Sequence, residues 1–233
     1  MKAILGLLLV CCAFVSAAGQ APAAQSAPRE ASLTRFQAAI DAFLAEDKVH
    51  PPPKGGILFV GSSIFRLWKN LKEQMAPLPV FNRAFGGSRT AEVLHYMDQI
   101  VLPYEPKIIV YYCGSNDVNA DEKAEAIFDR FRQFAVRVRE RLPATRIYYV
   151  SINRAPQKQD RWEIVDAVNG LAKAWCEKTP RMGFIDVNPA LFDKDGQPRM
   201  ELYLPDRLHF KEPAYEEFTK IVKPVIEKAW REK

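Results

Sequence analysis

Four short polar segments contain the side chains that serine-based ester hydrolysis requires. That chemistry needs a hydroxyl nucleophile, a base to take its proton and a group that orients the base. It also needs donors aimed at the developing oxyanion, each contributing about 3 kcal/mol to lowering the barrier. The segments are Gly61-Ser62-Ser63-Ile64, Asn82-Arg83-Ala84-Phe85-Gly86-Gly87-Ser88, Gly114-Ser115-Asn116-Asp117 and Asp206-Arg207-Leu208-His209.

Each catalytic role has a candidate among these residues. Ser63 can be the nucleophile and His209 the base. Asp206 lies three residues before His209, so one turn of backbone can bring its carboxylate to the imidazole Nδ1. The N–H groups of Ser63 and Gly87 and the side-chain amide of Asn116 can supply the oxyanion donors. Gly87 suits this role because a residue without Cβ lets the backbone approach a substrate closely.

Taken singly, these segments are weak signals. A serine after a strand often caps a helix, and a double glycine often marks a turn. Asp117 follows Asn116 and is expected to hold its loop by hydrogen bonds rather than to act in catalysis. The interpretation therefore depends on the whole set occurring in one chain.

The surrounding pattern predicts a three-layer α/β domain. Short runs rich in Val, Ile, Phe and Tyr alternate with stretches of helical periodicity. Most runs are apolar throughout, which is typical of strands buried on both faces of a parallel sheet. Ligands of such sheets bind beyond the carboxyl ends of the strands, where the first three polar segments fall. The expected strands are 56–60, 79–81, 107–113, 146–152 and 183–185, and an N-terminal helix is expected at about 33–46.

The order and spacing of the four segments resemble the SGNH (GDSL-type) hydrolase family, from about Gly56 to about Tyr215. The resemblance implies a flavodoxin-like fold with a five-stranded, mainly parallel sheet flanked by helices. It implies a carboxylic ester hydrolase that forms a covalent acyl-enzyme and needs no cofactor or metal. Small-molecule, lipid and acetylated-sugar esters are the implied substrates. The implied residues are the triad Ser63, Asp206 and His209 and the oxyanion hole Ser63, Gly87 and Asn116.

One position departs from the family pattern. Ser62 stands where the family usually has an aspartate, which is not a triad member. Catalysis is therefore expected to survive the change. The change also puts two hydroxyls side by side, so Ser62 is a competing nucleophile.

Other functions fit the sequence less well. An α/β-hydrolase needs Gly-x-Ser-x-Gly, and a nucleotide-binding domain needs Gly-x-Gly-x-x-Gly or a P-loop, but neither pattern occurs. Three scattered histidines without His-x-x-x-His argue against a zinc hydrolase. No dense basic run supports nucleic-acid binding despite a net charge of +5. The remaining alternative is a non-catalytic carbohydrate- or ligand-binding protein that keeps the fold, which would not need the full catalytic set.

The N-terminus predicts export to the periplasm or the medium. A charged start, a short apolar run and Val15-Ser16-Ala17 indicate a signal peptide over residues 1–17. An uncleaved anchor and a lipoprotein using Cys11 or Cys12 are the weaker alternatives. A flexible linker is expected at 18–30 and the hydrolase domain at 31–233, with no membrane span in the mature chain.

The remaining cysteines and arginines receive structural interpretations. Cys113 and Cys176 are expected to be buried free thiols, although an exported protein could also bridge them. Arginines near the strand ends are expected to form a solvated rim, and the alternative is that they favour an anionic substrate. The arginines are Arg66, Arg83, Arg89 and Arg154.

Overall fold

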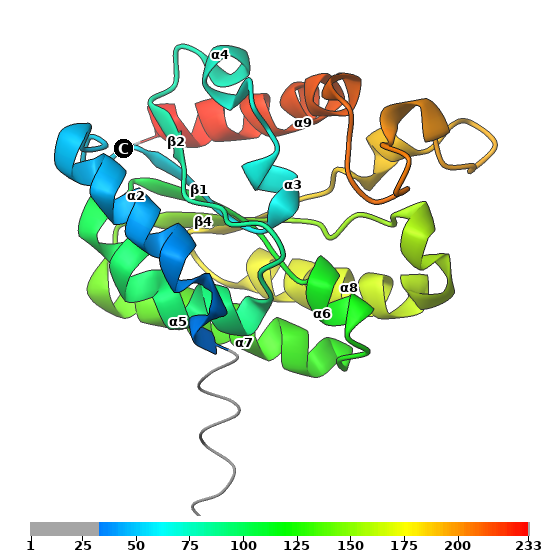
Figure 1. Ribbon diagram of the computed structural model, residues 1–233, viewed down its shortest axis with the longest axis horizontal. Coiled ribbons are helices and arrows are strands. Elements are labelled where there is room, and N and C mark those ends of the chain that lie inside the picture. Colours follow the sequence, from blue (N-terminus) through cyan, green and yellow to red (C-terminus); the bar gives the residue numbers. More distant parts are fainter. Residues whose placement is uncertain (1–32, 233) are drawn as a thin grey trace, which may run out of the picture.

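The computed structural model describes residues 33–232, which form one five-stranded sheet between two layers of helices (Figure 1). The strand order is β2-β1-β3-β4-β5, and every neighbouring pair is parallel. The predicted α/β architecture is confirmed. The strands are β1 (Ile57–Gly61), β2 (Val80–Asn82), β3 (Ile108–Tyr112), β4 (Arg146–Val150) and β5 (Met182–Ile185).

The central strands are apolar throughout because both of their faces are covered. Every residue of β1 and β3 is buried, whereas the edge strand β5 has only Ile185 buried. Side chains alternate between the two faces of a strand, so each central strand contributes to two cores. Leu58 and Val60 face one core, while Ile57 and Phe59 face the other.

Two helical layers cover the sheet. The first layer packs with Leu58 and Val60 and consists of α2, α5, α7 and α8; the second contains α3, α4 and α9 (Figure 1). The helices are α2 (Gln37–Val49), α3 (Ser63–Arg66), α4 (Leu71–Met75), α5 (Thr90–Ile100), α6 (Ser115–Asn119), α7 (Ala124–Arg141), α8 (Trp162–Lys178) and α9 (Glu212–Arg231). Short 3₁₀ turns lie at Thr34–Phe36, Leu102–Tyr104, Pro156–Arg161, Asn188–Leu191 and Met200–Leu202.

The long helices are amphipathic, and their apolar faces anchor the layers. Phe131, Phe134 and Val138 of α7 are buried at helical spacing. Burying one such side chain contributes roughly 1.5–3 kcal/mol relative to leaving it exposed. Phe218 and Val222 do the same for α9 on the opposite face of the sheet.

The predicted strands occur within a few residues of their expected bounds, but the N-terminal helix differs. It begins at Gln37 after a 3₁₀ turn and continues to Val49, three residues beyond the expected end. The proline run from Pro51 restricts mainly the residue directly before it, so the helix can continue almost to His50.

The two remaining cysteines are free and buried, as the sequence analysis favoured. Cys113 and Cys176 both lie in the core between the sheet and the layer that contains α7 and α8. Within residues 33–232 no helix is long and apolar enough to cross a bilayer. The expected signal peptide and linker, residues 1–17 and 18–30, lie outside the described residues.

The side chain of Asp117, in α6, contacts both α5 and α7. Its carboxylate is fully buried and accepts hydrogen bonds from the N–H and hydroxyl of Thr90, at the start of α5. Arg130 of α7 donates to the same carboxylate over 3.1 Å. Burial raises the pKa of Asp117, and the Thr90 and Arg130 contacts oppose this shift. Asp117 therefore holds its loop by hydrogen bonds, as the sequence predicted.

Replacing Asp117 by alanine should destabilise the protein strongly. The buried N–H of Thr90 would lose its acceptor, and Arg130 would lose this carboxylate and keep that of Glu122; a buried donor left unsatisfied typically costs about 1–3 kcal/mol. Asp129→Ala is the matched control, because Asp129 pairs with Arg132 on the surface and such pairs contribute about 0–1 kcal/mol. Urea unfolding measures both variants, and equal free energies of unfolding for the two would contradict the structural role of Asp117.

Candidate active site

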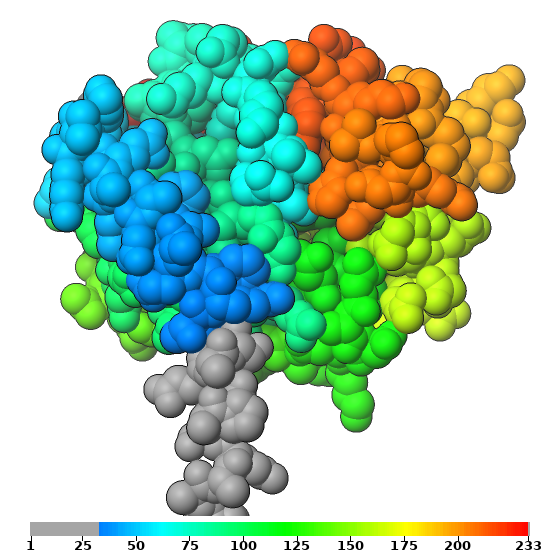
Figure 2. Space-filling model, viewed as in Figure 1, coloured from blue at the N-terminus to red at the C-terminus, as the bar shows by residue number. Residues whose placement is uncertain are grey.

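The four polar segments meet at one edge of the molecule. Ser63 follows β1, Gly87 follows β2, Asn116 follows β3, and Asp206 with His209 precedes α9. In a parallel sheet the carboxyl ends of neighbouring strands share one edge, so these loops converge. In Figure 2 the cyan segment around α3 and the orange loop before α9 lie against each other near the centre of the visible face.

The backbone at the end of β1 fixes the position of Ser63. Gly61 has φ +138°, and a Cβ there would lie 1.7 Å from the carbonyl oxygen of Tyr112 on β3. Only glycine fits this close approach. Ser62 is extended, its N–H donates to Tyr112 O over 3.0 Å, and Ser63 begins the short helix α3. The chain therefore turns sharply and places Ser63 at the edge of the sheet.

Ser63, His209 and Asp206 form one chain of hydrogen bonds. Ser63 Oγ lies 2.9 Å from His209 Nε2, and His209 Nδ1 lies 2.6 Å from Asp206 Oδ2. With the proton on Nδ1, the ring donates to Asp206, and Nε2 can accept the serine proton. This is the contact geometry that a serine nucleophile, its base and an orienting carboxylate require.

The loop that carries Asp206 and His209 is closed by its own hydrogen bonds. Leu204 N–H donates to His209 O over 2.7 Å, and Asp206 Oδ1 accepts from the N–H groups of Leu208 and His209. Burial acts to raise the pKa of Asp206, but the hydrogen bonds from the His209 side chain and from these N–H groups outweigh it and lower the pKa. The carboxylate is thus ionised at neutral pH and fixed beside Nδ1.

Gly87 is glycine because of its backbone angle. It has φ +81°, the left-handed region in which other residues are strained. Among residues 33–232, a Cβ here would lie near only the ring of Phe36, 3.8 Å away. Its carbonyl accepts a hydrogen bond from Arg35 over 3.1 Å, which holds the peptide in place.

Asn116 lies beside Ser62 rather than pointing freely into the site. Its Nδ2 donates to Ser62 Oγ over 2.8 Å and to Ser88 O over 2.9 Å. A primary amide has two N–H donors, so these bonds engage both. Ser62 is buried and contacts Asn116, whereas the hydroxyl in contact with His209 belongs to Ser63. The geometry therefore separates the two adjacent serines.

Other candidate groups are engaged elsewhere or lie apart. Arg83 is buried, donates to Tyr104 over 3.1 Å and pairs with Asp47, so the expected solvated rim is wrong at this position. Arginine is buried here because a carboxylate and a phenol satisfy its planar donors. Among residues 33–232 no group of three His, Cys, Asp or Glu side chains could hold a metal ion.

The profile of the GDSL-like lipase/acylhydrolase family matches residues 60–217, more than half of the chain and all four segments. The chain belongs to this family. The resemblance read from the sequence is confirmed, and the family assigns the chain to the hydrolases of ester substrates. No curated protein matches the sequence.

Solved structures share the fold of this GDSL-like hydrolase at low sequence identity. One is a structure from Streptococcus pneumonia whose description names a platelet activating factor. Its sequence is 21% identical to this chain, the match covers 88% of this chain and 100% of that protein, and the TM-score is 0.73. A GDSL-like lipase from Bacteroides thetaiotaomicron is 17% identical, with coverages of 82% and 98% and a TM-score of 0.68. A lipase/acylhydrolase from Enterococcus faecalis is 19% identical, with coverages of 74% and 95% and a TM-score of 0.60.

The sequence analysis missed Lys158, which supports two of the site's loops in this GDSL-like hydrolase. The ammonium group is fully buried and bonds the carbonyl and hydroxyl of Ser115, next to Asn116. The preceding N–H, of Gln157, donates to Arg207 O between Asp206 and His209. The polar run 157–161 looks like an exposed loop in the sequence, so no pattern indicated this burial.

Burial, with a smaller effect of the charge of Arg161, lowers the pKa of Lys158 to about 8. An unfolded lysine titrates at about 10.4, so between about pH 8 and 10.4 unfolding takes up a proton. The free energy of unfolding should therefore gain about 3 kcal/mol from this group as pH rises through that window. Lys158→Met should remove the gain, whereas Lys178→Met, at an exposed lysine, should keep it. Urea unfolding across this pH range measures the gain, and identical pH slopes for both variants would contradict the burial effect.

Proposed function

We propose that the chain hydrolyses carboxylic esters through a covalent acyl-enzyme on Ser63. The observation that supports this most directly is the continuous set of contacts from Ser63 Oγ through His209 to Asp206. Such a contact chain lets a serine lose its proton as it attacks. A helix-capping serine would not need a histidine that is itself oriented by a carboxylate.

The reaction runs in two halves. His209 Nε2 takes the Ser63 proton as Oγ attacks the ester carbonyl, and the same nitrogen then protonates the departing alcohol. Water enters next, His209 takes its proton, and the acyl group leaves Ser63 as a carboxylic acid. Asp206 remains ionised throughout and stabilises the imidazolium by its contact with Nδ1.

The oxyanion donors are the N–H of Ser63, the N–H of Gly87 and the side chain of Asn116. The first N–H groups of a helix have no acceptor within it, and Ser63 begins α3. Arg35 holds the next peptide, between Gly87 and Ser88, through the Gly87 carbonyl and so limits rotation of the segment that presents the Gly87 N–H. Asn116 already donates to Ser62 and Ser88, so it contributes only by exchanging one of these bonds for the oxyanion.

Small-molecule, lipid and acetylated-sugar esters are the proposed substrates. The similar structures are described as lipases and acylhydrolases, words that span both lipid and simple acyl esters.

Variants of the two adjacent serines test the mechanism. Ser63→Ala should lower kcat for p-nitrophenyl acetate by about 10⁴-fold or more, because the nucleophile is lost. Ser62→Ala should cost about tenfold, since it removes only an acceptor that holds Asn116. Asn116→Ala should cost about 10²-fold, the usual loss for one oxyanion donor.

Steady-state kinetics on folded variants provide the comparison, with circular dichroism as the folding control. A loss at Ser62 that equals or exceeds the loss at Ser63 would reverse the assignment. Parent protein that is inactive on every ester would favour the non-catalytic ligand-binding alternative.

We also infer that residues 1–17 direct export and are removed after Ala17. The charged start and the short apolar run support this proposal. The intact mass of protein recovered from the periplasm or the medium should correspond to a chain that begins at Ala18. A mass that retains residues 1–17 would contradict cleavage.

A further inference from the structure

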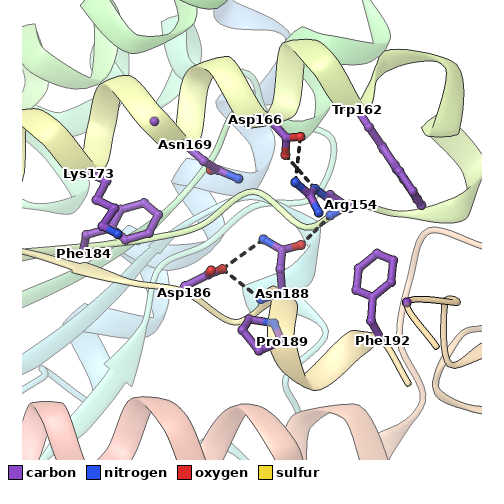
Figure 3. Close-up of a pocket in the computed structure, with 12 residues that line it drawn as sticks. Arg154, Trp162, Asp166, Asn169, Lys173, Phe184, Asp186, Asn188, Pro189 and Phe192 are labelled. Carbon is purple, nitrogen blue, oxygen red and sulfur yellow. Dashed lines mark hydrogen bonds and ion pairs between the residues drawn. The ribbon is translucent and has the colours of Figure 1, made fainter. Parts of the chain in front are cut away.

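A cavity lies between α8 and the segment that follows β5 (Figure 3). Its volume is about 530 Å³, within the range of small-molecule sites. Arg154 and Trp162 line it, and they flank the stretch whose Gln157 and Lys158 contact the active-site loops. None of the proposed catalytic residues belongs to its lining, so it is a separate pocket.

Two aromatic rings form one end of this pocket. The rings of Trp162 and Phe192 meet edge to face, with centroids 5.6 Å apart. The indole N–H donates to Ala155 O over 3.0 Å, which fixes the ring's orientation. In Figure 3 both rings stand together on one side of the cavity, opposite Lys173 and Phe184. A fixed, partly exposed aromatic pair offers apolar contact at little entropic cost.

The charged groups of the pocket balance one another. Arg154 binds Asp166 through two parallel hydrogen bonds of 2.6 and 2.7 Å, so its guanidinium is already engaged by a carboxylate. Asp186 accepts bonds from Ser151 and Asn188 through Oδ1, and within residues 33–232 no bond reaches its Oδ2. Lys173 supplies the remaining charge. Two positive and two negative side chains favour a neutral ligand rich in donors and acceptors over an anion.

A glycine in the middle of α8 leaves the wall of the cavity that this helix forms without a side chain at that position. Gly170 lines the pocket, and a Cβ at this position would meet nothing within 4 Å. Glycine in a helix interior is destabilising relative to alanine. Packing within the protein therefore does not require this glycine, and only a side chain much larger than a methyl group would reach into the cavity from this wall.

We propose that this pocket binds a neutral saccharide unit, separately from the proposed catalytic site. A sugar ring presents C–H groups on its faces, which suit Trp162 and Phe192. The hydroxyls at its edge can donate to Asp186 and Asp166, and such bonds to carboxylates are the stronger kind. A saccharide bound here would attach the protein to a glycan without contacting the residues of the proposed triad.

Binding is measured on the full chain carrying Ser63→Ala, so that no probe is consumed. The probes are cellobiose, xylobiose and di-N-acetylchitobiose, followed by isothermal titration and by tryptophan fluorescence. At least one should bind with a Kd on the order of 1 mM, as expected for a small ligand in an open pocket. Gly170→Phe fills the cavity and should weaken binding by about tenfold or more, while the matched Gly170→Ala should keep it.

Three results would overturn the proposal. The first is that none of the three disaccharides binds at 10 mM or above, which is about ten times the expected Kd. The second is that Gly170→Phe binds a disaccharide as tightly as the protein that keeps Gly170. The third is that the protein binds inorganic phosphate and not the sugars. Trp162→Ala is a second variant that should lose binding, and thermal melting checks that each variant is folded. Gly170→Phe without the Ser63 change should hydrolyse p-nitrophenyl acetate within about twofold of the parent, because the pocket and the proposed catalytic set share no residue and substitutions without shared partners act independently. Esterase failure and saccharide failure are therefore seen in separate assays.

Discussion

The hydrogen bond between Ser63 and His209 joins the first strand of the sheet to the loop before the last helix, 146 residues away in the chain. It can form only if β1 and α9 are placed correctly on the sheet. Gly61 turns the chain against β3, and the closed loop at Leu204–His209 holds the imidazole from the other side. The parallel order of the strands brings these loops to one edge.

Ser62, where the family usually has an aspartate, acquires a definite structural place. Its hydroxyl is buried and accepts from Asn116, away from the histidine. This hydrogen bond also engages one of the two N–H donors of the Asn116 side chain, which is expected in the oxyanion hole. Loop support from Asp117 on one side and Lys158 on the other leaves the Asn116 backbone well fixed, so only its side-chain bonds need to change on substrate binding.

The sequence predicted what depends on local pattern and on chain order. Continuous apolar runs revealed β1 and β3, because burial on both faces leaves no alternation. Three of the polar segments could be assigned because strand ends converge in a parallel sheet, and the fourth because Asp206 and His209 lie three residues apart and complete the catalytic set. The partners of Asn116, the burial of Lys158 and the pocket beside α8 could not, since each depends on how side chains from separate elements pack. Lys158 lies in a polar run that resembles an exposed loop.

The most direct test of the account is the site of covalent labelling by a serine-reactive phosphonate. Only an activated hydroxyl reacts, so the label reports which serine loses its proton to His209. Peptide mapping by mass spectrometry of the folded protein should place the label on Ser63, and His209→Ala should abolish it. A label on Ser62, or no label on folded parent protein, would contradict the assignment.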